Sequence, residues 1–163
     1  MKNILLEEVD YKRPSTIYTL SKIQNRALED FSSYFDNKTI LYLENFTDEK
    51  NLKEKIMFDK ISYFLIKNNE EIIGFIEYTK EEKELLINEF YTLIEYKNKT
   101  DFSKIMDLIT KNTKKDLKFF INSALTDDIE IFNLLNLEHL SSQIRYIGSD
   151  KFLKEEVFIK KIL

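Results

Sequence analysis

The stretch that decides the fold is ISYFLIKNNEEIIGFIEYTKEEKELLINEFYTLI, which spans residues 61–94. Its apolar positions are rich in β-branched and aromatic residues, and these residue types favour strands. We expect a tight turn at Asn68 and Asn69, because asparagine tolerates the positive φ of a hairpin turn, and a charged tip at Thr79–Glu84. The pattern predicts three consecutive strands, the last two adjacent and antiparallel: Ile61–Ile66, Glu71–Tyr78 and Leu85–Ile94.

Helical periodicity flanks this stretch on both sides. Pro14 suits the start of a long helix whose apolar residues recur as far as Phe35, and Thr47–Lys50 resembles the cap of a short helix. The segment Thr39–Phe46 between them has no period that identifies it. Beyond the three strands, we expect a helix from Phe102 that ends in the lysine-rich Lys111–Lys115 and a second helix at Thr126–Leu135. We expect further strands at Ile4–Val9, Leu117–Ile121, Gln143–Ile147 and Val157–Ile162. This order predicts a mixed α/β sheet with helices on its faces, in one domain over residues 1–163.

The composition excludes several classes of site. The chain has no cysteine and one histidine, His139, so disulfides, thiolate or multi-histidine metal sites and a cysteine nucleophile are excluded. It has two glycines, Gly74 and Gly148, which are too few for a P-loop or a glycine-fingerprint dinucleotide site. Hydrophobic residues make up 43% of the 163 residues and charged residues 33%, as in a folded domain with a sizeable core.

The charge balance argues against nucleic acid as a partner. There are 25 basic and 29 acidic residues, for a net charge of −4, so the chain as a whole repels phosphates. The N-terminal sequence MKNILLEEVD has too short an apolar run for a signal peptide, and no stretch approaches the ~20 apolar residues of a membrane span. These observations predict a soluble, cytoplasmic protein that binds neither nucleic acid nor membrane.

Four segments carry a family resemblance. Residues 63–76, YFLIKNNEEIIGFI, form a hairpin whose second strand has the form ivGfi, and residues 90–102, FYTLIEYKNKTDF, align without a gap with lyV-x-P-eyR-gkGiG. Residues 129–138, IEIFNLLNLE, are similar to Ai-x-lYeklGFe, and residues 157–163 to a closing strand. In this order they resemble the GNAT superfamily of acyl-CoA-dependent N-acyltransferases, which implies a mostly antiparallel central sheet flanked by helices. Asn136 replaces the glycine of the third segment, and asparagine suits a helix C-cap with positive φ.

The resemblance implies a binding site for acetyl-CoA at the end of the strand Leu85–Ile94 and in the turn after it. In the family, backbone N–H groups and the next helix N-terminus cradle the pyrophosphate. The residues that align with this site are Thr92, Leu93, Lys97, Asn98, Lys99, Thr100, Asp101 and Phe102. Because Thr100 and Phe102 stand at glycine positions, we expect weaker binding of acetyl-CoA than in a glycine-bearing relative. Phe102 would occlude the phosphates unless its ring turns into the core with Ile105 and Ile109, and Lys97 and Lys99 retain some attraction for phosphates.

The resemblance also implies the catalytic candidates. Transfer to an amine needs a base, and Glu89 and Tyr91 lie on the strand that would border the cleft, although either suits an ordinary strand position as well. His139 is a further base candidate, but a lone histidine is more often a surface or packing residue. Phe132 stands where many members have a tyrosine that protonates the thiolate, and phenylalanine cannot donate a proton. A backbone N–H near Thr92 or Leu93 would polarise the thioester carbonyl.

The sequence therefore leads to two functional hypotheses. The first is acyl transfer from acyl-CoA to a small-molecule or peptide amine, without a metal and at a rate lowered by the absent tyrosine. The second is a GNAT-like module for binding or assembly that lacks catalysis, since function belongs to the site and not to the fold. An unrelated α/β domain remains the third alternative, and a homodimer is left open.

Overall fold

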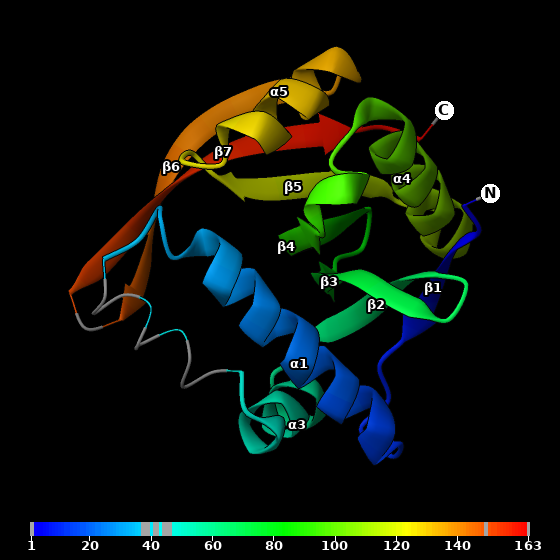
Figure 1. Cartoon of the computed structure of the whole chain (residues 1–163). Helices are drawn as coiled ribbons and strands as arrows, with labels where there is room; N and C mark the ends of the chain where they lie inside the picture. The colour runs from blue at the N-terminus through cyan, green and yellow to red at the C-terminus, as the bar shows by residue number, and fades with distance from the viewer. Residues whose placement is uncertain (1, 37–39, 41–42, 44–46, 149, 163) are drawn as a thin grey trace.

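The structure is a computed structural model that describes residues 2–36, 40, 43, 47–148 and 150–162 (Figure 1). The strands are β1 (Ile4–Glu8), β2 (Ser62–Asn68), β3 (Glu71–Lys80), β4 (Glu84–Thr92), β5 (Asp116–Asn122), β6 (Glu138–Gly148) and β7 (Lys151–Lys160). The helices are α1 (Pro14–Phe31), α3 (Glu49–Phe58), α4 (Lys99–Thr113) and α5 (Thr126–Leu134), with a short 3-10 helix η1 (Ile94–Tyr96). Most of Thr39–Phe46, which the sequence left without a prediction, lies outside the described residues.

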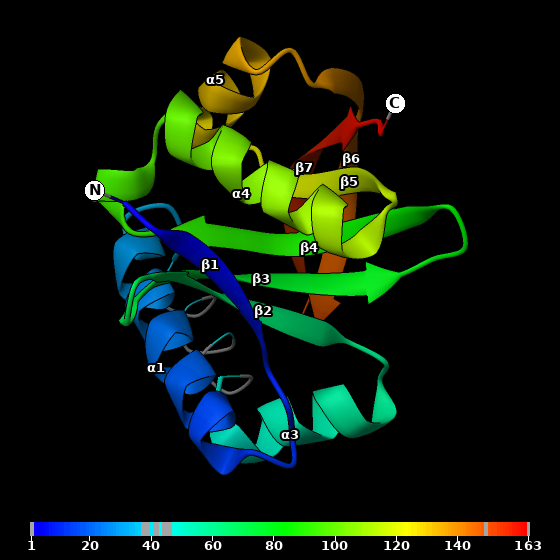
Figure 2. The same cartoon turned by 90° about the vertical axis from the view of Figure 1, so that its right-hand side faces the viewer.

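Within the described residues, seven strands form one sheet in the order β1-β2-β3-β4-β5-β7-β6. Neighbouring strands are antiparallel except β4 and β5, which are parallel. Helices α1 and α3 cover one face of the sheet, and α4 and α5 cover the other (Figure 2). The predicted mixed, mostly antiparallel sheet flanked by helices is confirmed, as is the antiparallel pairing of Glu71–Tyr78 with the strand that follows it.

Local signals in the sequence locate most element ends. Pro14 is the first residue of α1, and Asp48 caps α3 by accepting a hydrogen bond from the Asn51 N–H at 2.9 Å. Asn69 and Asn136 adopt φ values of 55° and 58°, as a tight turn and a helix C-cap require. These signals are local because each depends on the conformation of one or two residues.

The prediction was wrong at the ends of three strands. β4 ends at Thr92, and Ile94 already belongs to η1. β6 and β7 begin five and six residues earlier than expected and form a long hairpin. β6 is an edge strand, and its residues 141–146 are exposed, so it has no alternation of apolar and polar residues by which to recognise it.

β4 and β5 part after a short shared stretch. Their pairing runs from Glu84 opposite Asp116 to Ile87 opposite Phe119, and β4 then continues along β3 to Thr92. The register between β3 and β4 shifts at Asn88, which is an extra residue on β4. Such a bulge bends its strand, and here it lies where the pairing with β5 ends. The bulge therefore accounts for the gap that opens between β4 and β5.

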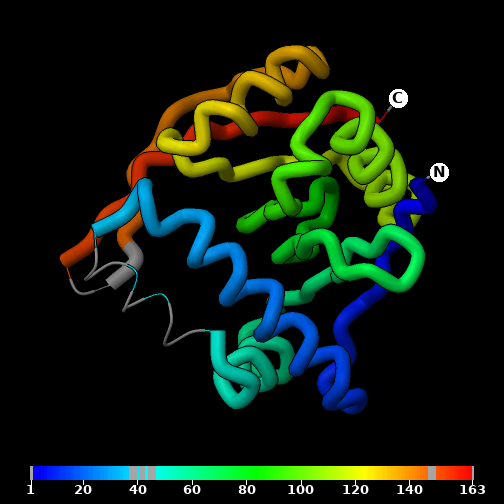
Figure 3. Tube along the Cα trace, in the orientation of Figure 1, coloured from blue at the N-terminus to red at the C-terminus, as the bar shows by residue number. Residues whose placement is uncertain are grey.

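The residues that follow α1 run toward the β6–β7 hairpin (Figure 3). The gap between β4 and β5 is therefore bordered by α1 on one side and by the hairpin on the other. Lys151 Nζ lies 2.9 Å from Asp36 Oδ2, which ties the start of β7 to the segment after α1. The C-terminal half of α1 and the hairpin thus face each other across the parting strands.

Candidate functional site

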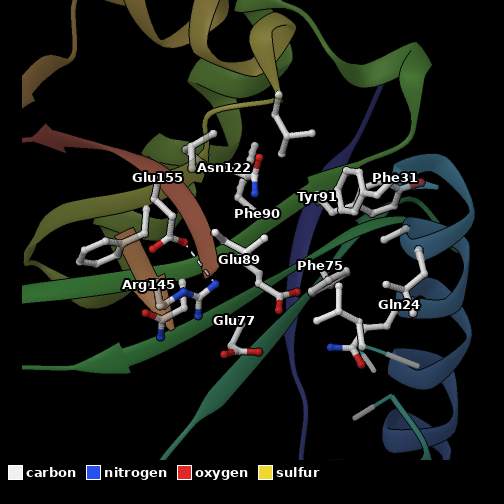
Figure 4. Close-up of a pocket in the computed structure, with 18 of the residues that line it drawn as sticks. Gln24, Phe31, Phe75, Glu77, Glu89, Phe90, Tyr91, Asn122, Arg145 and Glu155 are labelled. Atoms are coloured by element: carbon white, nitrogen blue, oxygen red, sulfur yellow. Dashed lines mark ion pairs between the residues drawn. The ribbon is translucent and has the colours of Figure 1, made fainter. Parts of the chain in front are cut away.

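A cavity of about 320 Å³ lies where β4 and β5 part, bounded by α1 and the β6–β7 hairpin (Figure 4). Aromatic rings form much of its wall. Among the described residues that line it, three are glutamates, Glu77 on β3, Glu89 on β4 and Glu155 on β7, and Arg145 on β6 faces them. A cavity that combines rings with carboxylates suits a ligand with an apolar body and a positive charge.

Glu89 is the carboxylate that the fold leaves without a partner. Its side chain opens into the cavity and makes no hydrogen bond or ion pair with any other residue in the described part of the chain. The Glu89 side chain keeps an exposed surface in the open cavity, but the protein packed around it limits its hydration and Glu77 lies opposite it on β3; together these raise the pKa of Glu89 to about 7 against the effect of Lys55 and Arg145. A carboxylate with this pKa accepts protons near neutral pH.

The other two glutamates have partners. Glu77 Oε2 accepts a hydrogen bond from the Tyr63 hydroxyl at 2.8 Å and lies 3.9 Å from Lys55 Nζ. Burial and Glu77 raise the pKa of Tyr63, so this hydroxyl stays a donor. Glu155 Oε2 lies 3.2 Å from Arg145 Nη2. Sequence reasoning missed all four of these charged cavity residues, Lys55, Glu77, Arg145 and Glu155. The signal for Glu77 was a glutamate inside the apolar run Ile72–Tyr78.

Tyr91, the second base candidate, forms part of the wall. Its hydroxyl donates a hydrogen bond to the Asp30 carboxylate, whose other oxygen lies 3.4 Å from Arg26 Nε. Burial and Asp30 raise the pKa of Tyr91. The tyrosine is therefore a committed hydrogen-bond donor, and of the two candidates Glu89 is the one that can accept a proton in the cavity.

The edge of β4 that faces the gap carries backbone donors. The Leu93 N–H donates to the Ile73 carbonyl at 2.8 Å, and because antiparallel pairing alternates, the N–H groups of Phe90 and Thr92 point away from β3 toward the gap. A Cβ on Gly74 would lie 2.0 Å from the Tyr91 carbonyl oxygen, so a glycine is needed for β3 and β4 to approach this closely. Of the two expected donors, Thr92 keeps its N–H available and Leu93 does not.

The N-terminus of α4 is capped by the chain itself. Asn98 Oδ1 accepts the Asp101 N–H at 2.9 Å, and Asp101 Oδ2 accepts hydrogen bonds from Asn98 Nδ2 at 2.7 Å and from Lys2 Nζ at 2.5 Å. The Asp101 residue is 3% exposed. Its carboxylate thus takes the place where a helix N-terminus favours an anion. Among the residues described here, the N–H groups of Lys99 and Thr100 have no partner.

Lys97, the basic residue of the turn, is neutralised inside the protein. Its Nζ lies 3.3 Å from Oδ1 of Asp128, a buried residue in the first turn of α5. Burial raises the pKa of Asp128, and Lys97 opposes that rise. The ion pair joins the turn before α4 to α5, and it uses the charge that the resemblance assigned to a phosphate.

Phe102 and Phe132 belong to the hydrophobic core. Both are 0% exposed, and their ring centroids lie 6.0 Å apart. The Phe102 ring is therefore turned into the core, away from the α4 N-terminus, and Asp101 beside it is the acidic residue in the first turn of that helix. The Phe132 ring also lies against other rings, at centroid distances of 4.9–6.2 Å: Phe90, Phe119 and Phe158.

His139 lies outside the cavity, on β6, with its Nε2 2.8 Å from Glu156 Oε2. In the part of the chain that the structure describes, no cluster of acidic and histidine side chains could hold a metal ion. None of the described helices is both long and apolar enough to cross a bilayer.

No model of a protein family and no curated protein sequence matches the chain. Solved structures do. The chain is 12% identical to the PaiA N-acetyltransferase of Thermoplasma acidophilum in complex with coenzyme A, with a TM-score of 0.58 over 98% of this chain and 99% of that one. A GCN5-related N-acetyltransferase of Rhodopseudomonas palustris is 11% identical, with a TM-score of 0.68 over 99% of this chain and 96% of that one. The spermidine N-acetyltransferase of Vibrio cholerae is 9% identical, with a TM-score of 0.65 over 97% of this chain and 93% of that one.

These matches cover nearly the whole chain, at identities that support a statement about fold alone. The seven-strand, mostly antiparallel sheet flanked by helices agrees with the resemblance found in the sequence. The chain has the GNAT fold of the acyl-CoA-dependent N-acetyltransferases.

Proposed function

We propose that the protein transfers an acyl group from its coenzyme A thioester to an amine that binds in the cavity beside β4. The observation that carries the proposal is Glu89, a carboxylate without a partner among the described residues, next to the donor-bearing edge of β4. A proton acceptor close to backbone hydrogen-bond donors is what amine acylation needs.

Glu89 is assigned the role of base. An alkylamine is protonated at neutral pH, since the ammonium of a lysine has a pKa of about 10.4, and it must lose a proton before it can attack a carbonyl. A carboxylate whose pKa is near 7 is largely ionised at slightly alkaline pH and can take this proton. The N–H groups of Phe90 and Thr92 are placed to donate to an oxygen that gains negative charge in the gap.

Acetyl-CoA would supply the activated acyl group, and the residues present fit it weakly. The edge of β4 offers hydrogen-bond donors to its extended arm, and the N–H groups of Lys99 and Thr100 are available to its phosphates. Asp101, which is paired with Lys2, places a carboxylate beside the position of those phosphates, and Lys97 is paired with Asp128. We therefore expect a dissociation constant for acetyl-CoA weaker than about 1 μM.

A second candidate function is amine binding without acyl transfer. It is favoured by the two internal ion pairs, Lys2 with Asp101 and Lys97 with Asp128, which pair the acidic side chain of the first α4 turn and the lysine before α4 without any ligand. In this case the cavity binds an amine, and the α4 N-terminus binds no phosphate.

Calorimetry with acetyl-CoA and with an amine panel, followed by mass analysis of the amines, distinguishes the two. Acetyl-CoA binding together with an acylated amine supports transfer. Amine binding without acetyl-CoA binding or product supports the second candidate. If neither ligand binds, both proposals fail.

The charge of Asp101 has its own test. We expect Asp101→Asn to raise the affinity for acetyl-CoA about tenfold, which corresponds to ~1.4 kcal/mol, because it removes a negative charge from the α4 N-terminus and keeps acceptor and donor atoms for Asn98. Calorimetry measures the change. Asp107→Asn, an exposed site farther along α4, is the matched control and should leave the affinity unchanged. Equal affinities of Asp101→Asn and wild type would show that the carboxylate does not obstruct the phosphates.

A further inference from the structure

The charges around the cavity define which kind of amine it can hold. We propose that the cavity selects an amine with a single positive charge and an apolar body, and that Lys55 excludes dications by neutralising Glu77. The proposal rests on the proposed function in one respect, since it takes this cavity as the acceptor site. It names a substrate class and a specificity-determining residue.

Two of the three glutamates in the described lining of the cavity are paired with a cation. Glu155 is paired with Arg145 at 3.2 Å, and Glu77 is 3.9 Å from Lys55. Of the carboxylates in the described lining, this leaves Glu89 as the one without a paired cation, whose charge a ligand can balance. A second positive charge on the ligand would meet carboxylates whose charge is already balanced, and it would lose its hydration without compensation.

The amide oxygen of Gln24 is an acceptor atom that lacks a donor in the described structure. Gln24 extends from α1, lines the cavity and is 5% exposed, and its Oε1 has no hydrogen-bond partner in the described structure. Its amide interacts with the Tyr63 hydroxyl, which also donates to Glu77, and the Glu89 charge acts on the same hydroxyl. Side chains from α1, β3 and β4 therefore surround this part of the cavity (Figure 4). A buried acceptor without a donor is costly, and an N–H of a bound ammonium would satisfy it.

The aromatic side chains of the cavity favour a ligand with an apolar body. Phe31, Phe75 and Tyr91 form a continuous aromatic wall, with ring centroids 5.6 Å apart for Phe31 and Tyr91 and 6.0 Å for Phe75 and Tyr91. Such rings favour contact with an apolar group, and a ring face also attracts an ammonium. An arylalkylamine combines the single charge with a body of this kind.

The test compares two amines on the whole protein by calorimetry. The probes are 2-phenylethylamine, a monocation with a ring, and 1,4-diaminobutane, a dication, with 2-phenylethanol as the uncharged analogue. We expect wild type to bind 2-phenylethylamine at least about tenfold more tightly than either other compound. Tighter or equal binding of the diamine by wild type would overturn the proposal.

Lys55 is tested by a change that should reverse the preference. Lys55→Met removes the charge that neutralises Glu77, so we expect the affinity ratio to move toward 1,4-diaminobutane by about tenfold. The matched control Lys53→Met, at an exposed site of α3, should leave the ratio unchanged. An unchanged ratio in Lys55→Met would assign the selectivity to another residue and refute this part of the proposal.

A double variant covers the case in which an unbalanced Glu77 disturbs the fold. Lys55→Met with Glu77→Gln removes both charges and should restore the wild-type ratio. Because calorimetry needs no acyl transfer, the two proposals fail separately. The expected amine selectivity without any product would refute the acyltransferase alone, and product formation with a diamine preference would refute the monocation proposal alone.

Discussion

Glu89→Gln is expected to lower the rate of acyl transfer by about 10²–10⁴-fold, the usual contribution of a positioned general base. Glutamine has nearly the shape of glutamate and cannot accept the proton. In wild type the rate should rise with pH through about 7, because Glu89 acts as a base only when ionised. The groups that shape this profile are Glu77 on β3, Lys55 on α3, and Arg145 and Glu155 on the hairpin.

Initial rates between pH 5 and pH 9 measure both effects. Glu71→Gln, the same substitution at an exposed site of β3, is the matched control and should keep the wild-type rate and profile. A Glu89→Gln variant that retains the wild-type rate would assign the proton transfer to another group.

The same substitution should raise stability. The pKa of Glu89 is higher in the folded chain than the ~4.3 of an unfolded one, so the protonated form stabilises the fold. That contribution is full below the unfolded pKa and is lost as the pH rises through 7. Glutamine stays neutral, so the Tm of Glu89→Gln should exceed that of wild type at pH 8, and the difference should shrink toward pH 5. Gain of stability with loss of rate is typical of a functional residue.

Phe132→Ala is expected to lose about 3–5 kcal/mol of unfolding free energy, because the ring is fully buried among other rings and its removal leaves a cavity. For a chain of this size the Tm should fall by roughly 10 °C. Thermal and denaturant unfolding measure the loss. Leu134→Ala, on the same helix at a residue that is 53% exposed, is the control and should cost far less.

Phe132→Tyr separates packing from chemistry at this position. The hydroxyl would enter a group of aromatic rings that contains no acceptor among the described side chains around it, so the variant should be less stable and no faster than wild type. A faster variant would mean that the ring borders the reacting thioester and that the packing described here does not hold in solution.

The sequence predicted what depends on neighbours along the chain. The Asn69 turn, the Asp48 cap and the β3–β4 hairpin follow from local pattern, and each is present. The β6–β7 register could not be predicted because an exposed edge strand has no buried face to mark it.

The candidate site divides in the same way. Glu89 was identified because its strand was identified. Gln24, Arg145 and Glu155 come from α1, β6 and β7, and their meeting with Glu89 depends on tertiary placement that no spacing encodes. At the α4 N-terminus, the alignment indicated Phe102, but it could not indicate the ion pair of its neighbour Asp101, whose partner Lys2 lies 99 residues away.

The short pairing of β4 with β5 is a weak connection between two parts of the sheet. In the described residues, β1–β4 and β5–β7 are two antiparallel units joined by four residue pairs, from Glu84 and Asp116 to Ile87 and Phe119. This seam is where the sheet can flex most easily, because little backbone pairing crosses it. The cavity lies at its open end and draws residues from both units. A bound molecule would therefore clamp the two units together, and its binding energy would oppose the opening of the whole sheet.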